Sequence, residues 1–362
     1  MSYKRSTMRT VLFAGVSTLA LTVGAAELRA ADLAPVPRAV LKAPPPVQTG
    51  VLTVWIEGAA FWTGGDKQRA FGDAFSTSFG TSFCTFGCST NDFGAFKPGV
   101  GWEAAGGADY RFAGSPWHVS FDFRYGRAKS KGQAFHTAFS TFTEGISNEI
   151  NVQAQAFAHQ TESHMVADFM IGRDIGLGGI LGMSQVKVGV RVADLEARLH
   201  IDAQVFASCN NSGSSCGLGN NSSASAAVSL DERSRFIGVG PRAAIEGTVP
   251  LGGPWAVDYM GGIAVLFGDR KLDANISGVN SFPNSGIQGL FAFHTQISDS
   301  KGVFNADASL ALAYWFTPRA KLSAGFRFDG YWQALKTFDV TGTITNVDRF
   351  YYGPFVRLTG QF

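Results

Sequence analysis

The stretch 349–362 at the end of the chain constrains the fold most, because its residues alternate strictly between two kinds of side chain. Neighbouring residues of a β-strand point to opposite faces, so one face here suits lipid and the other suits water. This alternation is typical of a transmembrane β-barrel strand, although the edge strand of a soluble sandwich would share it. One face carries Phe362, Gly360, Leu358, Val356, Pro354 and Tyr352, and the other carries Gln361, Thr359, Arg357, Phe355 and Gly353.

The composition favours the barrel over the sandwich. Charged residues make up 16% of the chain, well below the roughly 25% of soluble proteins. After residue 30 the sequence contains no apolar run of about 20 residues that could span a bilayer as a helix. Only helices and closed sheets satisfy every backbone group in lipid, so a membrane protein without such runs is expected to be a barrel.

The N-terminus predicts export. Residues 1–30 combine Lys4, Arg5 and Arg9 with an apolar run and small residues before a cut near Ala26 or Ala30, which is typical of a signal peptide. Removing them takes away four basic residues and one acidic residue, so the formal charge moves from +2 to −1. Nothing basic enough for nucleic acid remains. Residues 31–50 are Pro-rich and are expected to form a periplasmic tail, either a spacer or a contact for the cell wall or an assembly factor.

The segment 100–125 is the strongest local indication of architecture. Two alternating stretches, 100–112 and 117–125, flank the short connection 113–116, as expected of a β-hairpin. The same order of long loop, strand, short turn and strand recurs along the chain. It predicts an antiparallel up-and-down barrel over 51–362 with both termini periplasmic, about 10 strands, and short turns on the periplasmic side. Eight or twelve strands stay open, and long extracellular loops are expected at 64–96, 129–161, 200–231, 269–301 and 333–348.

Charged residues fall on the face opposite the apolar one, so they are expected to point into the lumen. In a wet lumen they would line a pore and filter small polar solutes, with a slight preference for cations. In a narrow lumen they would pair into a network that blocks flow, and around ten strands is close to the size that side chains can fill. The predicted pore-lining residues are Glu57, Glu103, Asp109, Arg111, Asp122, Arg124, Asp168, Arg191, Arg242, Glu246, Asp258, Asp307, Arg327, Asp329 and Arg357.

Four segments resemble the Legionella-type major outer membrane protein family of pore-forming barrels: WIEGAAFW, GWEAAGGADYRF, RFIGVGPRAAIEG and YYGPFVRLTGQF. The resemblance implies a porin-like passage for small hydrophilic solutes or ions in the outer membrane, and it brings no catalytic residues. The last segment is also similar to the closing strand of bacterial outer-membrane barrels, in which Phe362 would be read by the barrel-assembly machinery. Outer-membrane lipid and lipopolysaccharide are expected partners, and a homo-oligomer stays open. A non-conducting structural or adhesion barrel is the alternative.

The cysteines and histidines are further candidates for functional sites. In an exported chain, Cys84 with Cys88 and Cys209 with Cys216 are expected to form local disulfides, since their spacing suits zinc poorly. No His lies in a recognisable nucleophile motif, so the protein is not expected to be an enzyme or to need a metal or cofactor. The Phe-rich first loop could fold inward as a constriction, present an adhesive surface, or cover the barrel mouth with its own Phe side chains.

Overall fold

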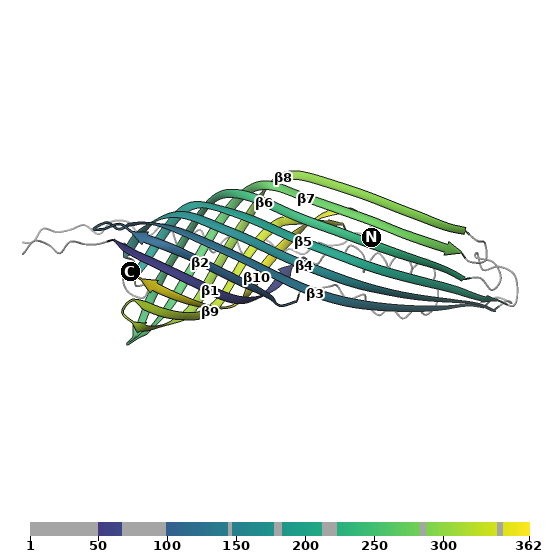
Figure 1. Ribbon diagram of the computed structural model, residues 1–362, viewed down its shortest axis with the longest axis horizontal. Coiled ribbons are helices and arrows are strands. Elements are labelled where there is room, and N and C mark those ends of the chain that lie inside the picture. Colours follow the sequence, from purple (N-terminus) through teal and green to yellow (C-terminus); the bar gives the residue numbers. More distant parts are fainter. Residues whose placement is uncertain are drawn as a thin grey trace, which may run out of the picture. The chain divides into compact units, whose positions relative to one another are not determined.

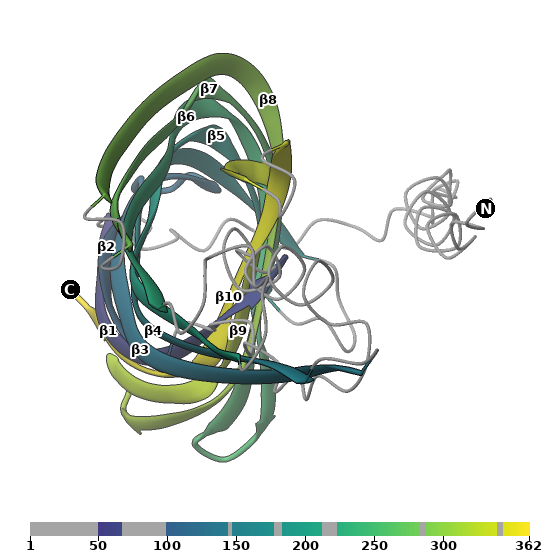
Figure 2. The ribbon, with the colours of Figure 1, turned by 90° about the vertical axis from the view of Figure 1, so that its right-hand side faces the viewer.

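The computed structural model describes residues 50–66, 99–143, 147–176, 183–211, 223–282, 287–338 and 343–362. Ten antiparallel strands form a closed ring, in which each strand pairs with its sequence neighbours and β1 pairs with β10 (Figures 1 and 2). The predicted ten-strand barrel is confirmed. The strands are β1 Val51–Gly65, β2 Gly101–Arg111, β3 Trp117–Thr143, β4 Ser147–Gly176, β5 Met183–Asn211, β6 Ser223–Gly252, β7 Trp255–Phe282, β8 Ile287–Thr317, β9 Ala320–Phe338 and β10 Ile344–Gln361.

The ring closes because the alternating faces of β1 and β10 match. Ile56 pairs with Leu358 on the outward face, and the next pair, Glu57 with Arg357, points inward.

At one end of the barrel the connections are short, and the β6–β7 turn uses Gly252 and Gly253 at φ 115° and 56°, a conformation that glycine adopts without steric cost. We call this the short-turn end.

An apolar band surrounds the barrel from the short-turn end upward. Its outward side chains are exposed, as in Leu310 (61%) and Val356 (53%), which suits contact with hydrocarbon rather than water. Aromatic residues are frequent at its limits. The outward apolar residues that mark the limit of the band away from the short-turn end are, from β1 to β10, Trp62, Trp102, Tyr125, Met165, Val192, Ile237, Phe267, Phe304, Trp332 and Phe350. Among the described residues, no helix has the length and apolar character that crossing a membrane would require.

Strands β3–β8 continue far beyond the apolar band, and Figure 1 shows them projecting past β1, β2, β9 and β10. The β3–β4 ladder runs on to the pair Thr143–Ser147. Most of 129–161, 200–231 and 269–301, expected as loops, is therefore strand, and that expectation was wrong. The alternation continues there, but the two faces exchange polarity: on β5 Asp194 and Glu196 point outward whereas Leu195 is fully buried inside. A prediction that requires apolar residues on the outward face therefore ends the strand where the polarity of the two faces is exchanged.

The end of β9 leaves the wall. Its ladder with β8 stops at the pair Phe304–Trp332, and Gln333 takes a positive φ of 58°. Beyond it, Leu335 is fully buried, and the backbone N–H of Lys336 donates to Ser234 Oγ on β6 at 2.9 Å. We call 333–338 with 344–347 the inner hairpin. The predicted loop 333–348 is thus largely strand turned into the lumen.

Candidate functional site

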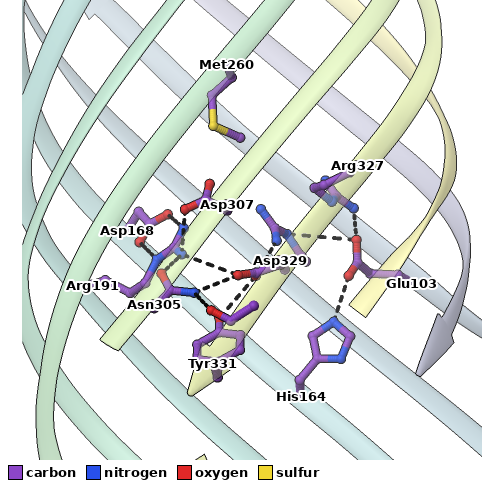
Figure 3. Close-up of polar contacts among 12 residues, drawn as sticks. Glu103, His164, Asp168, Arg191, Met260, Asn305, Asp307, Arg327, Asp329 and Tyr331 are labelled. Atoms are coloured by element: carbon purple, nitrogen blue, oxygen red, sulfur yellow. Dashed lines mark hydrogen bonds and ion pairs between the residues drawn. The ribbon is translucent and has the colours of Figure 1, made fainter. Parts of the chain in front are cut away.

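The lumen is the candidate site, and all fifteen predicted pore-lining residues lie on its inward face. Whether they line an open pore stays a prediction. Many of them meet in one charged layer across the barrel, drawn in part in Figure 3. This charged layer consists of Glu57, Glu103, Arg124, Asp168, Arg191, Arg242, Asn305, Asp307, Arg327 and Asp329.

Arg191 of β5 is the centre of one half of the charged layer (Figure 3). Its Nε and Nη2 donate to the two carboxylate oxygens of Asp168 on β4, each at 2.7 Å. Its Nη1 donates to Asn305 Oδ1 at 2.6 Å and to Asp307 Oδ1 at 3.0 Å, both on β8. Arg242 Nη2 donates to Asp307 Oδ2 at 2.8 Å. Since Arg191 is fully buried, its charge depends on these partners rather than on water.

The other half of the charged layer joins opposite walls. Arg124 Nη1 on β3 donates to Asp329 Oδ2 on β9 at 3.0 Å, although β2, β1 and β10 separate these strands around the ring. Arg327 of β9 pairs with Glu57 of β1 and with Glu103 of β2. The charged side chains of this layer touch across the lumen and are at most 12% exposed, so water has little access to the layer in the described conformation.

Between the charged layer and the short-turn end lies a cavity of about 440 Å³. We call it the vestibule. Its wall is charged, with Lys187 Nζ 2.9 Å from Asp109 Oδ2 and Lys321 Nζ 2.7 Å from Asp258 Oδ1. The other four predicted residues outside the charged layer, Arg111, Asp122, Glu246 and Arg357, line it as well. The vestibule is therefore a polar chamber that can hold water or small polar solutes.

On the other side of the charged layer a cluster of apolar side chains fills part of the lumen. Leu335 of the inner hairpin lies in a cluster with side chains from four strands of the wall, namely Leu195, Phe236, Leu266 and Val303. All five side chains are fully buried. Many inward positions here are apolar, although the buried ion pair of Arg349 Nη2 with Glu162 Oε1, at 3.2 Å, lies at the same level. The lumen is thus closed twice, first by ion pairs and then by a hydrophobic core.

Polar contacts hold the inner hairpin against the wall. Arg270 Nη1 of β7 donates to the Gln333 carbonyl oxygen at 2.8 Å, and Thr337 Oγ1 donates to Glu232 Oε1 at 2.8 Å. Glu232 lies beyond the apolar band, and burial raises its pKa to about 7, although the hydrogen bond from Thr337 lowers it. Sequence reasoning missed both residues, because Arg270 lies in a segment expected as a loop and Glu232 lies between such a segment and the strand expected to follow it. The period-two alternation of polar and apolar residues, which continues through these segments, was the signal that could have revealed them as strand.

The remaining predicted sites are not tested by the described residues. Cys84, Cys88 and Cys216, and the side chain of Cys209, lie outside them, as do residues 1–49 with the predicted signal peptide and most of the Pro-rich tail. The disulfides and the signal peptide stay predictions. Within the described part of the chain, no group of three or more His, Cys, Asp or Glu side chains is placed to hold a metal ion.

Comparison with known proteins places the chain among outer-membrane proteins. Residues 63–362 match the family model described as Legionella pneumophila major outer membrane protein precursor. No curated protein matches. The outer membrane protease OmpT of Escherichia coli is 8% identical, covers 87% of this chain and 97% of its own, and has a TM-score of 0.31. The Pseudomonas putida toluene transporter TodX is 10% identical, covers 88% and 91%, and has a TM-score of 0.19. Because the family model spans most of the sequence, the protein belongs to the Legionella major outer membrane protein family and resides in the outer membrane.

Proposed function

We propose that the protein is an outer-membrane channel for small hydrophilic solutes or ions, and that the described conformation is its closed state. The vestibule is the observation that carries this proposal. A chamber of about 440 Å³ with charged walls extends into the membrane level from the short-turn end. A barrel with a purely structural role would gain packing contacts from side chains that filled this chamber, whereas a channel needs the space for its solutes.

Passage requires two closures to move. The charged layer must separate at the Arg124–Asp329 pair, and the inner hairpin must leave the hydrophobic core. The inner hairpin has already left its ladder with β8 at Trp332. It can therefore swing away from β6 and β7 without opening the β8–β9 seam of the wall, at the cost of the side-chain contacts that hold it.

A non-conducting structural barrel is the second candidate, and the hydrophobic core favours it. A lumen filled by Leu195, Leu266 and Leu335 resembles the interior of a soluble protein more than a wet pore. If the core never opens, the charged layer serves only to hold the walls together.

Single-channel recording of the refolded protein in a planar bilayer tests the proposal. Wild-type protein is expected to show brief, rare conductance steps, because both closures must move together. Leu335→Asp places a charge in the hydrophobic core, which should weaken the inner hairpin and lengthen the open time. The matched control, Leu310→Asn, changes a lipid-facing residue of the apolar band and should leave the open time unaltered.

The two candidates predict different recordings. Steps from the wild type that become longer in Leu335→Asp support a channel closed by the inner hairpin. If neither protein gives steps, and both migrate as folded barrels in unheated gels, the non-conducting barrel is correct. Steps that are equal in both proteins would mean that solutes pass without displacing the inner hairpin.

A further inference from the structure

A band of positive charge crosses the outward face of β3–β7 just beyond the apolar band. Paired residues in an antiparallel sheet lie side by side, so the register defines rungs across the strands. Two neighbouring rungs, which we call the basic rungs, contain six basic and two acidic side chains, a formal net charge of +4. One consists of Arg127, Ser163, Glu196, Arg235 and Lys271, and the other of Lys129, Thr161, Arg198, Arg233 and Asp273.

Neighbouring acids neutralise only part of this charge. Glu196 is shared by Arg198 and Arg233, with Arg233 Nε at 2.9 Å. Asp194 lies on the neighbouring rung nearer the membrane, and its Oδ2 accepts a hydrogen bond from Arg235 Nη2 at 2.6 Å. Asp269 lies on that same nearer rung, so the three rungs together keep a net charge of +2. The two basic rungs therefore carry more guanidinium and ammonium groups than the carboxylates beside them can pair.

Three of the basic side chains are exposed and free to bind. Arg127, Lys129 and Lys271 have no carboxylate of a described residue within 4.0 Å. Arg198 and Arg233 add exposed guanidinium groups, with 60% and 49% of their side chains accessible. A guanidinium that is already bound to one carboxylate still has N–H groups left for a second anion.

The position of the basic rungs along the membrane normal identifies the kind of ligand. On these strands the continuous apolar band ends at Tyr125, Met165, Val192, Ile237 and Phe267, and the basic rungs follow within a few residues. Side chains at this level meet lipid headgroups, because hydrocarbon ends where the apolar band ends. The strands project from this end, opposite the short turns, so the headgroups belong to the outer leaflet.

We propose that the basic rungs bind the phosphate groups of a phosphorylated glycolipid of the outer leaflet. Arg presents paired N–H donors that match phosphate oxygens, and Lys adds a compact charge. The site is independent of whether the lumen conducts, because it lies on the opposite face of the wall.

Binding of diphosphoryl lipid A to protein refolded in a neutral detergent tests the proposal. The variant Arg127→Ser/Lys129→Ser/Lys271→Ser removes the three exposed basic groups without touching an ion pair. Each basic group near an anionic surface strengthens binding roughly fivefold, so this variant should bind on the order of 100-fold more weakly. The matched control Arg173→Ser/Arg319→Ser removes two exposed basic groups at the short-turn end and should bind like the wild type.

Further probes distinguish the sources of phosphate. Inorganic phosphate at the same concentration is expected not to raise the thermal unfolding midpoint, and lipid A stripped of its phosphates is expected to bind weakly. Equal binding of lipid A by wild type and triple variant would overturn the proposal, and so would equal stabilisation by inorganic phosphate. The charge-retaining variant Arg127→Lys/Lys129→Arg/Lys271→Arg should keep at least a tenth of the wild-type affinity for lipid A. A lower affinity of this variant would also contradict the proposal.

Discussion

Replacing Asp329 by Ala should destabilise the barrel strongly, because this carboxylate joins opposite walls of the lumen. It accepts hydrogen bonds from Arg124 Nη1 at 3.0 Å, Asn305 Nδ2 at 2.7 Å and Tyr331 Oη at 3.1 Å. Asp329 itself is 2% exposed, so water cannot replace it for these donors. Among the described carboxylates within 4.0 Å, Arg124 would keep the more distant Glu103, whose Oε1 lies 3.8 Å from its Nε.

The expected loss follows from the partners left behind. Removing one member of a buried ion pair costs about 3 to 5 kcal/mol, because the other charge stays buried without compensation. Unfolding in denaturant of protein refolded into lipid vesicles, followed by tryptophan fluorescence, measures this difference. Asp194→Ala is the matched control: its pair with Arg235 is partly exposed on the outward face, so its loss should cost less than about 1 kcal/mol.

A double replacement separates charge from packing. Arg124→Met/Asp329→Leu removes both charges and keeps similar volumes, and replacing a buried pair by apolar groups is often close to neutral. The double variant should therefore recover most of the stability that Asp329→Ala loses. If Asp329→Ala costs no more than Asp194→Ala, the charged layer does not hold the walls together and the reasoning is refuted.

Three further predictions concern pH, selectivity and assembly. In the closed state the pKa of Glu232 is raised to about 7 from its ordinary 4.5; the closed state therefore favours the protonated form. The resulting stabilisation of the closed state is complete below about pH 4.5 and is lost as pH rises through about 7, a loss of about 3 kcal/mol. In single-channel recordings the open time should therefore rise with pH in the wild type, and Glu232→Gln should abolish that rise. Arg242→Ala should shift the reversal potential in a salt gradient toward cations, since it removes a positive charge from the lumen, and an unchanged potential would exclude a filter role. Phe362→Ala should reduce the folded barrel in isolated outer membranes relative to Leu358→Val, whereas equal amounts would show that assembly does not read the terminal residue.

The sequence alone was enough to determine the wall of the barrel. Alternation with a period of two is a local property, and the contrast between lipid and water makes it visible in residues such as Ile56 and Leu358 on one face and Glu57 and Arg357 on the other. It therefore predicted the ten strands, the short turns and the inward direction of the charged side chains.

Only the tertiary structure decided where the lumen closes. The contact of Arg124 with Asp329 depends on the curvature and stagger of the whole ring, which bring β3 and β9 together across the lumen. The inner hairpin and the projecting parts of β3–β8 escaped prediction for a related reason. Beyond the membrane the lipid no longer requires an apolar outer face, so the polarity of the two faces follows from what packs inside, as Leu195 against Leu335 shows.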